Sequence, residues 1–197
     1  MTAIKAIETS YNGYRFRSRL EARWAVFFDK AGIRYFYEHE GYDLGDEYYL
    51  PDFYLPDFDL FVEVKPDTFE AAVKGSTTLG KLVKKTRRNG LLCLDDPAAG
   101  KLILETISIS GRCTGTVCKF VMYDDRVVLL YDDDGRKEEY KVPVPFIKPD
   151  LIGTSKYFTG DEHLLWERAY GGDPDNPIDK AAAAARRARF EYGEEGA

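Results

Sequence analysis

The chain has 197 residues, of which 44% are hydrophobic and 14% aromatic, and its formal net charge is −6. This composition excludes a disordered chain, and the length suits one domain with extensions. No apolar run approaches the roughly 18 residues of a membrane span, and residues 1–10 lack the apolar segment of a signal peptide. We therefore expect no membrane partner and a cytoplasmic location.

The first element that we expect is a helix that runs to about Ala31. Ser18 and Glu21 form a capping box, with Ser18 as N-cap and Glu21 at the third helical position, and Gly32 closes the helix. At 100° per residue, one apolar arc of the helix collects five side chains, Leu20, Trp24, Phe27, Phe28 and Ala31. Glu21 falls on the flank of this arc.

The segments after this helix predict three strands, a second helix and a further strand. The strands are expected at 33–40, 48–55 and 60–65, the helix at 77–89 and the last strand at 91–94. This is an α/β arrangement with the element order αβββαβ. We expect residues 1–95 to form this core around a mixed central sheet.

Charged residues interrupt the third of these strands in an unusual way. Glu63 and Lys65 stand two positions apart in an apolar run, so period two sends both to the same face, about 7 Å apart. A turn at Pro56 and Asp57 makes the preceding strand its hairpin neighbour, which returns Asp52 toward Glu63. Two carboxylates can hold a hard divalent cation, and an ammonium can orient water or neutralise phosphate charge. The alternative is a hairpin with a surface salt bridge, because short motifs often match by chance.

The segments Pro51-Asp52 and Glu63-Val64-Lys65, taken with the element order, resemble the PD-(D/E)XK nuclease superfamily. The resemblance implies a restriction-endonuclease-like fold, DNA as substrate and Mg²⁺ or Mn²⁺ as cofactor. It implies that Asp52, Glu63 and the Val64 carbonyl bind the ion and that Lys65 acts on the attacking water and the phosphate. It also implies that Glu21 completes the metal site. Capping is the alternative role for Glu21, and one carboxylate can serve both roles.

The function expected from this resemblance is a metal-dependent DNA endonuclease that hydrolyses phosphodiester bonds directly. Within this class we favour a structure-specific enzyme such as a junction-resolving endonuclease. A transposon-end endonuclease subunit and a non-catalytic module that binds nucleic acid or a host protein are the alternatives. Residues 14–23 and the closing residues resemble small nuclease-like proteins of phages and mobile elements. That likeness implies the cytoplasm of a bacterial host cell, and it leaves a homodimer or a host or phage protein open as partner.

Acidic and basic residues are separated along the chain. Nine acids and no Lys or Arg lie between Tyr35 and Val64. Two basic segments flank this stretch, and we expect them to contact phosphates on either side of the site. The candidates are Arg15, Arg17 and Arg19 before the first helix, and Lys81, Lys84, Lys85 and Arg88 in the second. The alternative is that these cations form solvated helix faces.

The rest of the chain carries less chemistry. Residues 96–150 predict a β-meander with strands at 101–109, 117–123, 126–131 and 138–144. Residues 151–197 predict a C-terminal helical segment with helices at 161–170 and 178–192. Because the alanine run 181–185 offers little to bury, we expect the last helix to dock through Ile178, Phe190 and Tyr192.

Overall fold

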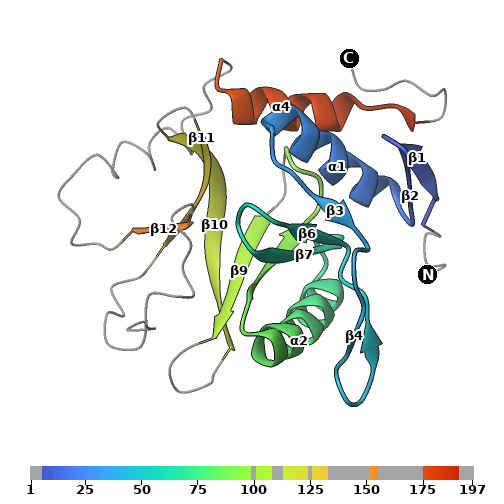
Figure 1. Ribbon diagram of the computed structural model, residues 1–197. Helices are drawn as coiled ribbons and strands as arrows, with labels where there is room; N and C mark the ends of the chain where they lie inside the picture. Colours follow the sequence, from blue (N-terminus) through green and yellow to red (C-terminus); the bar gives the residue numbers. More distant parts are fainter. Residues whose placement is uncertain are drawn as a thin grey trace.

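An eight-stranded mixed sheet lies at the centre of the molecule, with helices on both of its faces (Figure 1). The computed structural model describes residues 6–98, 101–107, 113–123, 126–132, 151–154 and 175–190. Helices α1 and α4 pack together on one face of the sheet, and helix α2 covers the other. Their bounds are α1 Arg19–Ala31, α2 Phe69–Thr86 and α4 Pro177–Arg187. The predicted mixed α/β class is confirmed.

The order of strands in the main sheet is β12-β11-β10-β9-β8-β7-β6-β3. The β7–β8 and β11–β12 pairs are parallel, and the other pairs are antiparallel. The strands are β3 Phe36–Tyr37, β6 Phe53–Leu55, β7 Leu60–Lys65, β8 Asn89–Leu94, β9 Lys101–Ile107, β10 Cys113–Tyr123, β11 Arg126–Asp132 and β12 Leu151–Thr154. Two small hairpins stand apart from this sheet, β1 Thr9–Tyr11 with β2 Tyr14–Phe16, and β4 Tyr42–Asp43 with β5 Tyr48–Tyr49.

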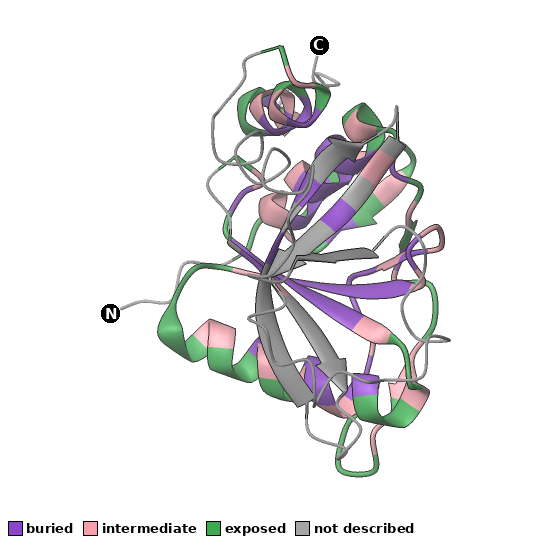
Figure 2. Cartoon of the chain, turned by 90° about the vertical axis from the view of Figure 1, so that its left-hand side faces the viewer, coloured by how far each residue is buried: buried purple, intermediate pink, exposed green. Residues whose placement is uncertain are grey.

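Alternation along the central strands builds two cores, one on each face of the sheet. Val62 and Val64 of β7 belong to the core under α1 and α4, whereas Phe61 belongs to the core under α2. Figure 2 shows the central strands as buried segments between the two helical layers. Because Glu63 and Lys65 share the alternation of Phe61, they emerge on the α2 face.

Helix α1 begins and ends where the sequence predicts. The Ser18 side chain accepts the Glu21 N–H, and Gly32 ends the helix with φ 71°, a left-handed conformation that suits glycine. Helix α2 begins at Phe69, eight residues before the predicted start, with Thr68 as its N-cap. Gly75 inside α2 lowers helix propensity, but a Cβ there would lie 2.8 Å from Leu92 Cδ1, so the glycine permits close packing on the sheet.

Two predicted strands are shorter than expected. The strand predicted at 33–40 is reduced to Phe36–Tyr37, and the one at 48–55 is divided between β5 and β6. Pro51 lies at the division, and it lacks the N–H that a continuous ladder would use. The β5 half turns away from the main sheet and pairs with β4 instead.

The meander continues the same sheet, because β9 pairs directly with β8 across the expected boundary at residue 95. The strand predicted at 138–144 and the helix predicted at 161–170 lie outside the described residues. Strand β12, which pairs in parallel with β11, was not expected from the sequence. Within the part of the chain that is described, no helix combines the length and apolar character needed to cross a bilayer.

Helix α4 packs against α1 through its alanines. The expectation that these alanines bury little is wrong, because small side chains let two helices approach closely. The buried residues of this segment are Ile178, Ala181, Ala182, Ala185 and Ala188. Phe190 contributes as predicted, with its ring 6.3 Å from that of Tyr11, and Tyr192 lies outside the described residues.

Candidate active site

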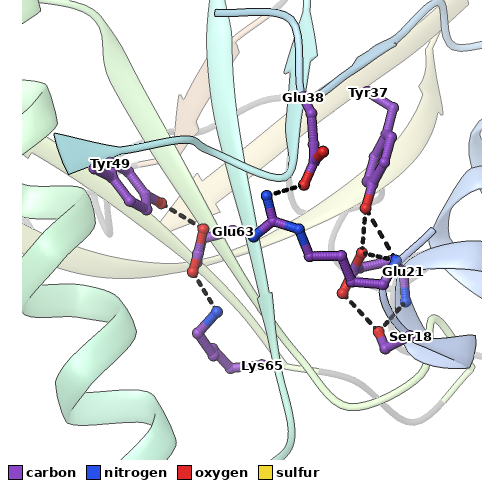
Figure 3. A network of polar contacts seen from close by, with 8 residues as sticks. Ser18, Glu21, Tyr37, Glu38, Tyr49, Glu63 and Lys65 are labelled. Atoms are coloured by element: carbon purple, nitrogen blue, oxygen red, sulfur yellow. Dashed lines mark hydrogen bonds and ion pairs between the residues drawn. The ribbon is translucent and has the colours of Figure 1, made fainter. Parts of the chain in front are cut away.

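Strand β7 carries Glu63 and Lys65 to the sheet face covered by α2. Glu63 is only 5% exposed although it carries a carboxylate. The Lys65 ammonium pairs with its Oε1, and the Tyr49 hydroxyl donates to its Oε2. Figure 3 shows Tyr49 and Lys65 reaching Glu63 from two sides. Both oxygens of this carboxylate therefore accept a hydrogen bond within the protein.

Asp52 lies opposite Glu63 at the start of β6. The antiparallel register pairs Phe53 with Val62, and one further pair along this register sets Asp52 against Glu63. Asp52 is 7% exposed, and its Oδ2 accepts the Val64 N–H at 2.7 Å. The two predicted acids thus share one face of the sheet, and the Asp52 side chain replaces a main-chain partner for Val64.

Pro51 affects the other backbone group of Val64, its carbonyl. Two further pairs along the register would set Pro51 against Val64, but proline has no N–H to donate to the Val64 carbonyl. The carbonyl leaves the strand on the same side as the Val64 N–H, which is the side of Asp52. Among the described residues, the Lys65 ammonium donates to this carbonyl at 3.3 Å. The proline therefore leaves a backbone oxygen available beside the two carboxylates.

The site around Asp52 and Glu63 contains more acidic than basic groups. Burial, followed by repulsion from Glu63, raises the pKa of Asp52 well above its usual range, against the attraction of Lys65 and the Val64 N–H. Burial lowers the pKa of Lys65, but attraction by Glu63 and Asp52 outweighs it, so that this pKa is raised overall. Burial beside Glu63 also raises the pKa of Tyr49 far above its usual range. Lys65 is therefore an ammonium and Tyr49 a neutral donor, and one cation faces two buried acids.

These residues line one pocket of about 430 Å³. Its walls come from the Arg17 segment, the β4–β5 hairpin with the residues after it, strand β7 and helix α2. The lining residues are Arg17, Glu47, Tyr48, Tyr49, Leu50, Asp52, Glu63, Lys65, Lys74, Gly75 and Thr78. A ligand that enters this pocket thus meets Asp52, Glu63 and Lys65 together.

Glu21 occupies a separate network next to this pocket. Its Oε1 accepts from Ser18 Oγ at 2.7 Å, and its Oε2 accepts from Tyr37 Oη at 2.7 Å and from Arg17 N at 3.1 Å. Figure 3 shows Ser18 and Tyr37 converging on Glu21. The capping role is confirmed. Glu21 does not line the pocket, although its charge is near enough to raise the pKa of Asp52, and its role as a metal ligand stays a prediction.

The arginines before α1 have different surroundings. Arg17 lines the pocket and forms an ion pair with Glu38. Arg15 forms an exposed ion pair with Glu8. Arg19 opens α1 and is half-buried. Of the three arginines that we expected to contact DNA, Arg17 therefore lies at the candidate site.

Three of the four candidate DNA-binding residues at the end of α2 contact acidic or carbonyl groups. Lys81 pairs with Asp46 at 2.6 Å and with Glu47 at 3.0 Å, and Lys85 donates to the Asp43 carbonyl. Arg88 pairs with Asp59 at 3.2 Å, and its guanidinium lies over the rings of Tyr54 and Phe61. Lys84 is exposed. Acids that we expected around the cation site therefore hold the β4–β5 hairpin and the sheet against α2.

Sequence reasoning did not assign Tyr48, Tyr49 or Thr78 to the site, and it counted Lys74 only as part of the basic segment around the second helix. Lys74 and Thr78 are four residues apart and lie on one face of α2. Because the helix was predicted to begin at residue 77, Lys74 fell outside it and this shared face was not predicted. Tyr49 reaches Glu63 only because the β4–β5 hairpin folds back over β7. No sequence signal that we recognise marks such a contact.

The donor set suits a hard divalent cation. Carboxylates of Asp52 and Glu63 and the carbonyl of Val64 are oxygen ligands, and Mg²⁺ commonly binds through one or two carboxylates while water and phosphate fill its other positions. Within the described residues, no group of three or more His, Cys, Asp or Glu side chains could share one ion. An ion here would therefore depend on the two acids, the carbonyl and oxygens from outside the chain. Comparisons with protein-family models, with curated proteins and with solved structures found no match to this chain.

Proposed function

We propose that this protein is a metal-dependent endonuclease that hydrolyses phosphodiester bonds in DNA. The observation that carries the proposal is the buried pair of Asp52 and Glu63, which shares a pocket with Lys65. Burial, followed by repulsion from Glu63, raises the pKa of Asp52 in this pair. Two acids with one compensating cation are unfavourable in a buried site unless further positive charge arrives. A divalent cation supplies that charge, and perturbed acids in a pocket are typical of functional sites.

The fold supports the same proposal. The sequence of elements α1, β3, β6, β7, α2 and β8 follows the αβββαβ order of a restriction-endonuclease-like core, apart from the small β4–β5 hairpin. Strand β7 lies inside the sheet between β6 and β8, which fixes Glu63 and Lys65 on a rigid element. The nuclease superfamily that the motif resembles uses this arrangement.

Mg²⁺ or Mn²⁺ would be held by the Asp52 and Glu63 carboxylates and the Val64 carbonyl. A bound divalent cation supplies Lewis acidity and lowers the pKa of a coordinated water. Lys65, as an ammonium, would donate to a phosphate oxygen and offset the charge that develops during hydrolysis. Its raised pKa favours this role over removal of a proton from water. Tyr49 would hold the Glu63 carboxylate in one orientation through its hydroxyl.

Within this class we favour a structure-specific enzyme of the junction-resolving type. The small pocket and the absence of a separate specificity domain among the described residues favour recognition of DNA shape over recognition of a long base sequence. Digestion of single-stranded, duplex, flap and four-way-junction substrates in Mg²⁺ and in Mn²⁺ tests this choice. Cleavage of plain duplex at the rate of the branched substrates would contradict it.

A non-catalytic binding module is the second candidate, and one observation favours it. Both Glu63 oxygens already accept hydrogen bonds, from Lys65 and from Tyr49, so the side chain has partners without an ion. Such a module would bind nucleic acid or a protein but would not cleave DNA.

Nicking of supercoiled plasmid separates the two candidates. We expect cleavage that requires Mg²⁺ or Mn²⁺ and that falls more than about a hundredfold in Asp52→Asn, the effect of losing about 3 kcal/mol of transition-state stabilisation. Asp46→Asn is the matched control, because Asp46 pairs with Lys81 outside the pocket. Equal cleavage by Asp52→Asn and wild type, after identical purification, would reject the nuclease proposal.

A further inference from the structure

The β4–β5 hairpin presents two neighbouring tyrosines that differ sharply in exposure. Tyr49 is 8% exposed and donates to Glu63, whereas Tyr48 is 74% exposed, and both line the pocket. Adjacent residues of a strand point to opposite sides, so burying Tyr49 directs Tyr48 outward. A large aromatic ring at the rim of a pocket with acids and lysines is not explained by packing of the core.

The ring of Tyr48 lies directly against Gly41. A Cβ on Gly41 would lie 2.0 Å from the Tyr48 hydroxyl oxygen and 2.3 Å from Cζ, so any other residue at this position would displace the ring. The ring is therefore held against backbone and keeps most of its surface open. A seated aromatic ring costs little conformational entropy when a flat group stacks on it.

Lys74 faces the pocket from helix α2 and differs from the lysine two turns later. Lys81 contacts Asp46 and Glu47, whereas Lys74 is exposed and makes no hydrogen bond or ion pair with the described residues. Thr78, one turn after Lys74, adds a hydroxyl to the same wall. An ammonium with no acidic partner is suited to a phosphate.

We infer that the outer part of this pocket binds an unpaired nucleotide, with its base stacked on Tyr48 and its phosphate held by Lys74. The inference rests on the proposed function, because it names the form of nucleic acid that reaches Asp52 and Glu63. The pocket volume of about 430 Å³ is in the range of small-molecule sites and fits a nucleotide. A base inside a duplex is already stacked on both faces, so it cannot stack on Tyr48 unless the strands separate.

Binding of single strands with and without bases tests this inference. The probes are a labelled oligothymidylate and an abasic strand of the same length, measured by fluorescence anisotropy in Ca²⁺. Stacking on one aromatic ring is worth about tenfold in affinity, so wild type should prefer the strand with bases by about that factor. Tyr48→Ala should lose the preference while Tyr48→Phe keeps it. Lys74→Ala should weaken both strands equally.

Phe69→Ala is the matched control, because Phe69 is 87% exposed yet does not line the pocket. It should bind both strands like wild type. A base preference that persists in Tyr48→Ala, or a wild type that binds duplex as tightly as the single strand, overturns the inference. Oligouridylate distinguishes RNA from DNA as the source of the nucleotide. Because the assay needs no cleavage, the stacking site and the nuclease proposal can fail separately.

Discussion

Glu21 and the Asp52–Glu63 pair are buried to a similar degree, and their surroundings differ in kind. Glu21 is 8% exposed, against 7% and 5% for the pair. It accepts hydrogen bonds from two hydroxyls and one backbone N–H, all neutral donors that belong to the start of α1 and to β3. The pair has one ammonium, one hydroxyl and one backbone N–H as donors, and burial, followed by repulsion from Glu63, raises the pKa of Asp52.

Under the proposed function, this contrast separates a structural acid from the acids of the active site. A carboxylate with a full set of local donors stabilises the element that provides them, here the first turn of α1. Two carboxylates that repel one another are retained only where something else offsets the repulsion. Burial alone would rank the three acids together, whereas the balance of charge distinguishes them.

The largest difference should appear in turnover. Glu63→Gln should lower cleavage more than about a hundredfold, because it removes the charge of a proposed metal ligand, whereas Glu21→Gln should retain activity within about tenfold. Single-turnover rates on the best substrate of the panel measure both effects. A loss in Glu21→Gln as deep as that in Glu63→Gln would assign Glu21 to the metal site, as the family resemblance implies.

The order should reverse for stability. Glu21→Ala should destabilise the protein by about 2 kcal/mol, because it removes a cap partner and leaves the O–H of Tyr37 without its acceptor, although the hydroxyl oxygen still accepts the Arg17 N–H. Asp52→Asn should not destabilise it in EDTA, since the amide oxygen can still accept the Val64 N–H while the like charge disappears. Urea unfolding in EDTA measures both variants. A larger loss in Asp52→Asn would show that Asp52 is mainly structural.

Asp52 should also give metal-free stability a distinctive pH dependence. Its folded-state pKa lies above the value in the unfolded chain, so the folded protein binds the proton more tightly. The stability that this proton contributes is present at low pH and is lost as pH rises through the raised pKa. The difference in unfolding free energy between wild type and Asp52→Asn in EDTA should therefore change in favour of the variant as pH rises. A difference that stays constant with pH would contradict this origin.

The smallest effect concerns two lysines of α2. Lys84→Ala should flatten the salt dependence of DNA binding by up to nearly one log–log unit, if its ammonium contacts a phosphate. Lys81→Ala should change it much less, because Asp46 and Glu47 already neutralise that ammonium. Affinities measured over a series of salt concentrations in Ca²⁺ give both slopes. Slopes that match the wild-type slope in both variants would show that DNA avoids this end of α2.

The charged residues at the centre of the pocket could be predicted from the sequence, whereas several of the residues that line it could not. Asp52, Glu63 and Lys65 follow from period two and one hairpin, both of which are local rules. Tyr49 and Lys74 reach the pocket through tertiary packing of the β4–β5 hairpin and of α2, which no local rule gives.

The misplaced boundaries have the same origin. Helix α2 begins at Phe69, after the Thr68 cap, and contains Gly75, which leaves room for Leu92, although glycine usually argues against a helix interior. The expected strand at 48–55 stops at Pro51, where a missing N–H ends one ladder and leaves the Val64 carbonyl beside Asp52. Pro51 therefore both interrupts the strand predicted at 48–55 and leaves the Val64 carbonyl available at the candidate site.

If Asp52 and Glu63 hold a divalent cation, that ion should stabilise the folded protein through these two side chains. The melting temperature of wild type should be several degrees higher in saturating Mn²⁺ than in EDTA. An ion at about one hundred times its dissociation constant stabilises a protein by about 2.7 kcal/mol. Glu21→Gln should keep most of this rise, and Asp52→Asn should lose it. If Mn²⁺ does not change the melting temperature of wild type, or if it raises that of Asp52→Asn equally, the proposal that Asp52 and Glu63 bind a divalent cation is contradicted.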